Sequence, residues 1–160
     1  MINIKNFVII LISISQLSSC SKDSGTPNSS QNEIMSMKIN GQAKQFQFAG
    51  RGLSFYNGEY GTLRIDLFTG VLSPQQDSYA ITLELPYKGI GNNIIKEIRY
   101  FRVKDATSIG GDFVQGQLQS NVKENTELRF SATFSGSTVI DGNKISITEG
   151  IINHVYEDPF

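Results

Sequence analysis

The sequence predicts an all-β chain: a single antiparallel β-sandwich or a small β-barrel of about nine strands, behind a signal peptide and a flexible tether. Two observations lead to this class. Apolar and polar residues alternate with a period of two from Glu33 onward, as they do in strands with one buried face. Turn residues recur at short intervals, and no segment shows the pattern of a capped amphipathic helix.

The 160 residues divide at a lone cysteine. Residues 7–12 form an apolar run behind Lys5; the run is shorter than the roughly 20 residues of a membrane-spanning helix but is typical of a signal peptide. We expect a lipoprotein signal peptide over residues 1–19, a lipidated cysteine and tether over residues 20–32, and a β-rich domain over residues 33–160. An uncleaved anchor helix is the alternative for the apolar run.

The boundary itself, Leu17-Ser18-Ser19-Cys20, has the pattern of a lipobox. Small residues before a single cysteine, behind leucine and an apolar run, mark the cleavage and lipidation site of bacterial lipoproteins. Cys20 is therefore expected to carry acyl chains such as palmitate, and two chains hold a protein on a membrane where one does so only marginally. The expected location is the bacterial outer membrane, with the membrane bound through Cys20.

Residues 21–32 contain no apolar side chain large enough to bury. A segment rich in Ser, Asn and Gly cannot offset its ordering entropy by burial, so we expect a flexible tether. Lys22-Asp23 also loosely resembles the surface-export signal of Bacteroidota lipoproteins, but Ser24 breaks that pattern. The sequence therefore leaves two alternatives for the side of the outer membrane that the protein faces: the periplasm or the cell surface.

The first strands of the domain are predicted from alternation and turn chemistry. Residues 35–39 alternate up to Asn40-Gly41, a pair that tolerates the positive φ angles of a type I′ hairpin turn. The returning strand through residues 46–48 is expected to end at Gly50-Arg51-Gly52. Another strand then runs to a second turn at Asn57-Gly58.

The middle of the chain holds the clearest strands. Residues 62–68 and 78–85 alternate strictly, and Pro86 ends the second of them, since proline cannot donate to a strand ladder. Residues 94–103 mix helical spacing with strand-forming residues, and we interpret them as mostly strand. Residues 104–112, with Gly110-Gly111, are expected to form a turn-rich connection.

The last third of the domain continues the pattern. A weak strand is expected through Phe113, Val114 and Leu118, and a secure one over residues 128–135. Asp141-Gly142 is another hairpin turn signal, with alternating residues beyond it. Gly150 is expected to mark a bulge or bend before residues 151–156.

Several of these features together resemble a family of small Bacteroidota lipoproteins with a β-rich domain of unknown function. They are the lipobox, the tether, Lys38-Ile39-Asn40-Gly41, the segment 130–136 and the segment 147–150. The resemblance spans most of the chain after Cys20. It implies the location and the fold, and it supplies no catalytic residue.

Charge and composition exclude several classes of function. The formal net charge is −1, whereas nucleic-acid surfaces need clustered Lys and Arg. Basic residues of the domain are instead scattered singly among acids, among them Lys38, Lys44, Arg64, Arg99, Arg102, Lys123 and Arg129. We expect no nucleic-acid partner. A single cysteine also excludes an intrachain disulfide and a cysteine-based metal site.

Catalytic and metal sites find little support in the sequence. His154 is the only histidine, so two-histidine metal patterns are impossible and one candidate general base remains. No Gly-x-Ser-x-Gly nucleophile motif, EF-hand loop or glycine-rich phosphate loop occurs. We expect an ordinary strand-end histidine, solvated acids, and no catalytic residue, metal or cofactor.

Aromatic residues beside turns supply the one candidate binding site. Tyr56, Tyr60 and Tyr87 border predicted turns, and Lys88 follows the third tyrosine. Rigid amphipathic rings at loop tips are common contact residues for proteins and glycans; the alternative is that they cap the core. In an up-and-down arrangement, the turns at Asn40-Gly41 and Asn57-Gly58 and the loop after Pro86 would share one end, opposite the entry of the tether.

These observations predict a lipid-anchored envelope protein that acts as a non-catalytic module binding a protein or glycan partner. Two alternatives stay open. The chain could be a periplasmic inhibitor or immunity protein directed against a toxin or hydrolase, or a small hydrolase with an unrecognised site.

Overall fold

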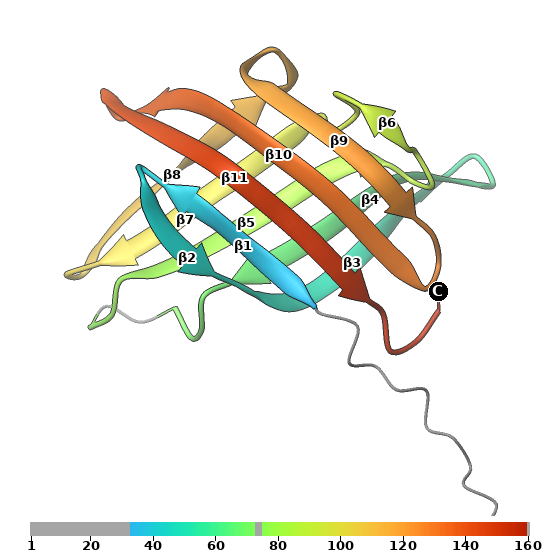
Figure 1. Ribbon diagram of the computed structural model, residues 1–160, viewed down its shortest axis with the longest axis horizontal. Helices are drawn as coiled ribbons and strands as arrows, with labels where there is room; N and C mark the ends of the chain where they lie inside the picture. The colour runs from blue at the N-terminus through green and yellow to red at the C-terminus, as the bar shows by residue number, and fades with distance from the viewer. Residues whose placement is uncertain (1–32, 73–74, 160) are drawn as a thin grey trace, which may run out of the picture.

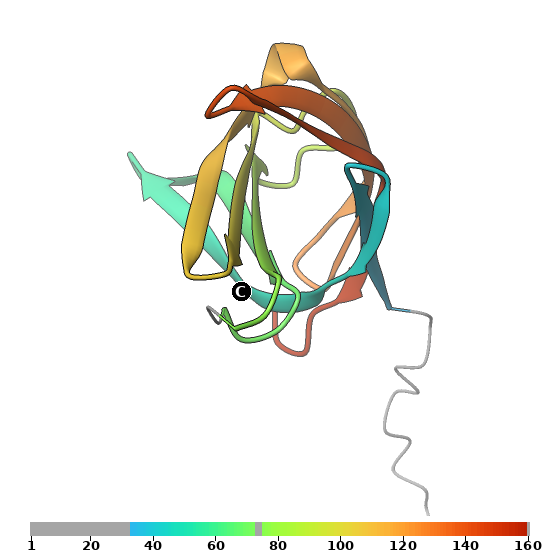
Figure 2. The same ribbon diagram turned by 90° about the vertical axis from the view of Figure 1, so that its left-hand side faces the viewer.

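The computed structural model describes residues 33–72 and 75–159, and within them the chain is all-β. Two antiparallel sheets face each other and are not closed into a barrel (Figure 1, Figure 2). The predicted fold class is confirmed in its sandwich form. The predicted signal peptide 1–19, Cys20 and the tether 20–32 lie outside the described residues.

One sheet has six strands in the order β2-β1-β11-β10-β9-β6. Its strands, in chain order, are β1 (Ile34–Ile39), β2 (Gln42–Gln45), β6 (Gly91–Asn92), β9 (Leu118–Asn125), β10 (Arg129–Ile140) and β11 (Asn143–Val155). The long β10 and β11 form its centre and pair antiparallel over most of their length.

The other sheet has five strands in the order β3-β4-β5-β7-β8, so β3 and β8 are its edges. Its strands are β3 (Gln47–Tyr56), β4 (Glu59–Phe68), β5 (Ser78–Pro86), β7 (Glu97–Lys104) and β8 (Thr107–Val114). A 3-10 turn, η1 (Gln115–Gln117), connects β8 to β9 and so returns the chain to the six-stranded sheet.

The core lies between the inner faces of the two sheets. The alternation predicted for residues 62–68 and 78–85 is confirmed, because Leu63, Ile65 and Leu67 of β4 are each 1% exposed. Ile81 and Leu83 of β5 are fully buried beside them. Full burial of one such side chain contributes about 1.5–3 kcal/mol, so the two central strands anchor the sandwich.

The three predicted hairpin turns are confirmed. The first residue of each pair has a left-handed φ, 47° at Asn40, 52° at Asn57 and 49° at Asp141, and the following glycine is also positive. A fourth turn of this kind joins β7 to β8 at Asp105 and Ala106, with φ of 50° and 59°.

That fourth turn corrects two predictions. Residues 104–112 are not a turn-rich connection, since they hold the end of β7 and most of β8, including both glycines of Gly110-Gly111. The weak strand expected through Phe113, Val114 and Leu118 is divided between β8 and β9 by η1. Residues 94–103 are mostly strand as predicted, because β7 begins at Glu97.

The prediction that Gly50-Arg51-Gly52 ends a strand is wrong. These residues lie inside β3, which pairs with β4 from Gln47 to Tyr56 and absorbs two register shifts on the way. The chain therefore runs from β2 into β3 with only Phe46 between them, and passes from one sheet to the other without reversing (Figure 1). The turn at Asn57-Gly58 and the loop after Pro86 consequently lie at the end opposite to the predicted one.

Candidate functional site

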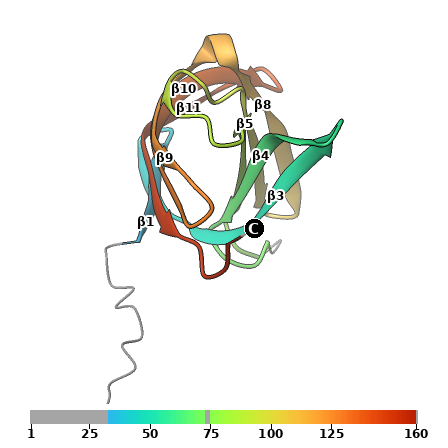
Figure 3. The ribbon, with the colours of Figure 1, turned by 90° about the vertical axis from the view of Figure 1, so that its right-hand side faces the viewer.

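The aromatic surface is the group formed by Phe55, Tyr60, the half-buried Tyr87 and Lys88. Its centre is the β3–β4 hairpin, which extends beyond the body of the sandwich (Figure 3). Phe55 is 63% exposed, Tyr56 77% and Tyr60 54%. These rings flank the hairpin turn at Asn57-Gly58 and are exposed to solvent.

The structure brings most of the predicted binding residues together. The rings of Tyr60 and Tyr87 meet edge to face with centroids 5.5 Å apart. Phe55, which the sequence analysis did not select, meets Tyr60 in the same way at 5.2 Å. Lys88 places Nζ 5.2 Å from the centroid of the Tyr87 ring. Tyr56 is the next residue after Phe55 in β3, and consecutive strand side chains point to opposite faces, so this predicted residue lies on the other face of the hairpin.

Tyr87 differs from the other rings because it is also part of the fold. Its backbone N–H donates to the carbonyl oxygen of Gly61 at 3.0 Å, and its ring packs partly against the core. The alternative that the tyrosines cap the core therefore holds in part for Tyr87. Tyr60 is the more exposed member of the pair and the better probe of binding.

The predicted orientation of this surface is wrong. Lys88 Nζ lies 2.8 Å from Glu127 Oε1 in the β9–β10 turn, and Arg51 donates to the carbonyl oxygen of Glu127 at 2.8 Å. Arg51 also donates to the carbonyl oxygen of Asp158, beyond the end of β11. Ile34 pairs with Asn153 of β11, so the described chain enters at the same end, and the aromatic surface lies there too.

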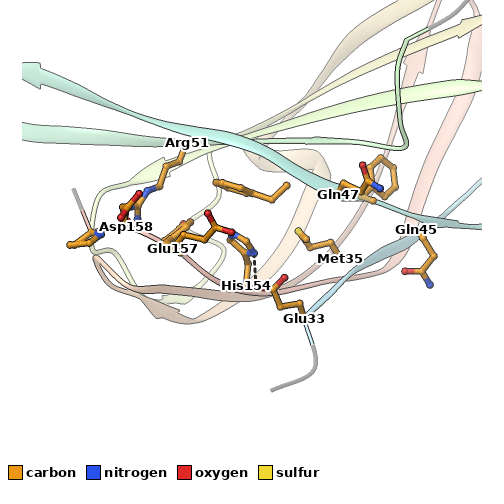
Figure 4. Close-up of a pocket in the computed structure, with 12 residues that line it drawn as sticks. Glu33, Met35, Gln45, Gln47, Arg51, His154, Glu157 and Asp158 are labelled. Atoms are coloured by element: carbon orange, nitrogen blue, oxygen red, sulfur yellow. Dashed lines mark hydrogen bonds and ion pairs between the residues drawn. The ribbon is translucent and has the colours of Figure 1, made fainter. Parts of the chain in front are cut away.

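The second candidate site is a pocket of about 800 Å³ between β3, the start of β1 and the end of β11 (Figure 4). We call it the histidine pocket. Its lining residues are Glu33, Met35, Gln45, Phe46, Gln47, Phe48, Arg51, His154, Tyr156, Glu157, Asp158 and Pro159. Gln45, Phe46 and Gln47 of its lining are the residues through which the chain crosses from β2 to β3.

His154 is the buried centre of the pocket wall. It is 8% exposed and its ring stacks on Phe48 with centroids 4.1 Å apart and an interplanar angle of 26°. Nδ1 lies 3.2 Å from Oε1 of Glu33, within ion-pair distance (Figure 4), but it makes no hydrogen bond of acceptable angle. Burial lowers the pKa of His154 from its ordinary value of 6.5, although the Glu33 carboxylate opposes this shift.

Arg51 and Tyr156 form the neighbouring part of the wall. The Arg51 guanidinium lies 3.6 Å from the centroid of the Tyr156 ring, a cation–π contact. Tyr156 is 4% exposed and its hydroxyl has no hydrogen-bond partner among the described residues. Burial raises the pKa of Tyr156 to about 12, so the phenol is neutral at physiological pH.

The histidine pocket was not predicted, because its residues come from three distant segments. A local signal did exist. Ile152, His154 and Tyr156 are alternate residues and all three are buried, so the period of two places His154 on the inner face of β11. The expectation of an ordinary strand-end histidine missed this burial.

The stability of the fold is expected to fall below about pH 6.5 because of His154. The folded chain holds this residue with a lowered pKa, so the unfolded chain binds the proton first as the pH drops, and the free energy of unfolding decreases. Urea denaturation at pH 7.5, 6.5 and 5.5 measures the effect, and His154→Gln should flatten the decrease. An equal decrease in the variant would assign the pH dependence to other groups.

Other site types were sought in residues 33–72 and 75–159. No group of three or more His, Cys, Asp or Glu side chains could hold a metal ion there. The same residues include no helix that is long and apolar enough to cross a membrane. The described chain thus presents two candidate binding regions, the aromatic surface and the histidine pocket, at one end of an antiparallel β-sandwich.

No protein-family model, curated protein or solved structure matches the chain.

Proposed function

We propose that the chain is a lipid-anchored, non-catalytic binding module of the bacterial envelope, and that its aromatic surface docks a protein partner. The observation that carries this proposal is the set of edge-to-face contacts that joins Phe55 and Tyr60, on the extended hairpin, to Tyr87, just after β5. Contacting rings hold one another in place, so a partner binds them with little further loss of side-chain entropy.

Two features favour a protein over a glycan. β3 is an edge strand of its sheet, and an edge strand offers backbone N–H and C=O groups to an added strand. Tyrosine is also enriched among the residues that dominate protein interfaces. The rings are tilted at 62° and 68° to one another, so they do not form the flat platform on which a sugar chain could stack along its length.

The membrane anchor rests on the lipobox at Cys20, the polar segment 21–32 and the resemblance to small Bacteroidota lipoproteins. In this proposal the outer membrane lies on the side where the described chain enters. The aromatic surface lies at that same end, so the length of the tether controls how far a partner can reach it.

An inhibitor or immunity protein is the special case in which the partner is an enzyme or toxin. The extended hairpin supports that case, since a narrow two-stranded ribbon can enter the cleft of an enzyme. A hydrolase is not favoured, because the buried ring of His154 is packed between aromatic side chains rather than held next to an exposed nucleophile.

Tyr60→Ala is expected to weaken binding of the partner about thirtyfold, the roughly 2 kcal/mol of an interface hot spot. The partner is first identified by cross-linking in whole envelopes, and its affinity is then measured by surface plasmon resonance. Tyr60→Phe keeps the ring and should retain most of the affinity. Val139→Ala, at a 66% exposed site outside the aromatic surface, is the control.

Unchanged affinity in Tyr60→Ala, with the melting temperature also unchanged, would rule out the aromatic surface as the docking site. Binding of an oligosaccharide that is lost in Tyr60→Ala would assign the surface to a glycan instead.

A further inference from the structure

We propose that the histidine pocket is a second binding site, independent of the aromatic surface, for a small organic cation: an ammonium group carried on an aromatic or apolar body. The carboxylate of Glu33 would bind the ammonium group, and the rings and thioether of the pocket wall would hold the body (Figure 4).

The size and lining of the pocket fit a small molecule. Its volume of about 800 Å³ lies within the range of about 300–1,000 Å³ that is usual for ligand sites. Met35 and Phe46 are 8% and 6% exposed, and Phe48 adds a ring already stacked on His154. An apolar wall with a few polar groups around it is the usual composition of such sites.

The charges of the lining residues favour a ligand of positive charge. Three carboxylates, those of Glu33, Glu157 and Asp158, face one guanidinium, that of Arg51. Because burial keeps His154 neutral near pH 7, the lining has a net charge of −2. The Arg51 guanidinium already contacts the Tyr156 ring and two carbonyl oxygens. An anion is therefore repelled and a cation attracted.

Glu33 is the carboxylate best placed to bind the cation. Its side chain is 42% exposed, so one oxygen can meet a ligand from solvent while Oε1 faces the buried His154 ring. The backbone N–H of Val155 donates to the same Oε1 at 3.4 Å, which helps to fix the carboxylate at the mouth. Ammonium carries only donors, and a carboxylate with an accessible oxygen accepts them.

Two buried polar atoms of the wall make no hydrogen bond of acceptable geometry with the described residues: the hydroxyl oxygen of Tyr156, and Nδ1 of His154, which has only the ion-pair contact with Glu33 Oε1 at 3.2 Å. A buried polar atom without a hydrogen bond destabilises the fold, so its presence in a native structure calls for an explanation such as a ligand. Both belong to the lining of one pocket. Their coincidence there is a second, independent sign of a ligand site.

The test compares three probes of matched shape and different charge: phenethylammonium, the neutral 2-phenylethanol and the anionic 3-phenylpropionate. Binding to the purified full chain is followed by calorimetry and by the NMR signals of the His154 ring. The cation is expected to bind about tenfold more tightly than the neutral probe, and the anion more weakly than either. Because a bound cation opposes protonation nearby, it should also lower the pKa of His154.

Glu33→Gln keeps the shape of the side chain and removes the charge, and it should reduce the affinity for phenethylammonium to that for 2-phenylethanol. Asp158→Asn, at the rim, should reduce it less. Glu59→Gln, on the β3–β4 hairpin and outside the pocket, is the matched control and should change nothing. The proposal is overturned if 3-phenylpropionate binds as tightly as the cation, if the cation fails to bind, or if Glu33→Gln binds it as well as the wild type.

Discussion

Replacing Gly150 by valine is expected to lower the free energy of unfolding by about 3 kcal/mol or more, a large fraction of the roughly 5–15 kcal/mol that is typical of a domain. A Cβ atom at this position would lie 2.6 Å from Cε2 of the Phe134 ring and 2.7 Å from the Phe134 carbonyl oxygen. The ring could move, but the carbonyl belongs to β10, the strand paired with β11 at this point. Overpacking of this kind typically costs 1–3 kcal/mol, and valine adds two further methyl groups.

The backbone around Gly150 cannot easily shift to relieve this clash. The β10–β11 register shifts beside Phe134, and Glu149 has a left-handed φ of 52°, so the predicted bulge at Gly150 is confirmed. Such bulges fix the direction of a strand. Here the bulge directs the end of β11, which carries His154, towards Glu33 and Phe48.

Urea denaturation measures the cost, and Gly150→Ala should show a smaller loss of stability than Gly150→Val. Gly52→Ala is the matched control, because a Cβ at that position in β3 meets no atom within 4 Å. A stability of Gly150→Val within about 0.5 kcal/mol of the wild type would show that β10 and β11 can separate here freely.

Most of the fold could be predicted because its signals are local. Strict alternation over residues 62–68 and 78–85 predicts strands with one buried face. In the structure these residues form β4 and β5, whose apolar faces are buried in the core. Asn-Gly and Asp-Gly pairs report the backbone angles of a hairpin turn. The turn at Asp105 and Ala106 has the same left-handed angles without glycine, and residue preference alone therefore missed it.

Gly110-Gly111 was wrongly predicted to belong to a turn-rich connection. Glycine is needed there because neighbouring strands approach closely and leave no room for a side chain. A Cβ at Gly111 would lie 2.8 Å from Cγ1 of Ile140 on the facing sheet, and one at Gly110 would lie 3.1 Å from the ring of Phe101. These glycines allow close approach within and between sheets. Gly50-Arg51-Gly52 misled for a different reason: no neighbour requires glycine there, since a Cβ at Gly50 or Gly52 would meet no atom within 4 Å, and both glycines lie inside β3. The strand end predicted there reversed the predicted orientation of the aromatic surface.

The two candidate binding regions differ in how much of each could be predicted from the sequence. Tyr60, Tyr87 and Lys88 border turns, so local chemistry selected them, and the pairing of β4 with β5 brings them together. The histidine pocket joins Glu33, Phe48 and His154. Their proximity depends on the pairing of β1 with β11 and on the crossing from β2 to β3, which no local pattern encodes.

Cys20→Ala is expected to move nearly all of the protein from the membrane fraction to the soluble fraction. The anchor that we propose consists of acyl chains on this cysteine, each CH₂ contributing about 0.8 kcal/mol when buried in the bilayer. The apolar run 7–12 is too short to replace the chains as a spanning helix. Salt-washed membranes and detergent-phase partitioning measure the distribution, and labelled palmitate measures acylation directly.

Ser24→Ala is the matched control for this substitution. It changes one side chain of the predicted tether and leaves Leu17-Ser18-Ser19-Cys20 intact, so acylation and partitioning should both stay at the wild-type level. Palmitate incorporated into Cys20→Ala, or wild-type protein without palmitate, would refute the lipid anchor whatever the partitioning shows. If Cys20→Ala loses both the palmitate label and its place in the membrane fraction, the acyl chains are attached at the sulfur of Cys20. A soluble Cys20→Ala protein should also still bind the partner through Tyr60, because the first strand of the sandwich that carries the aromatic surface begins well beyond Cys20, at Ile34.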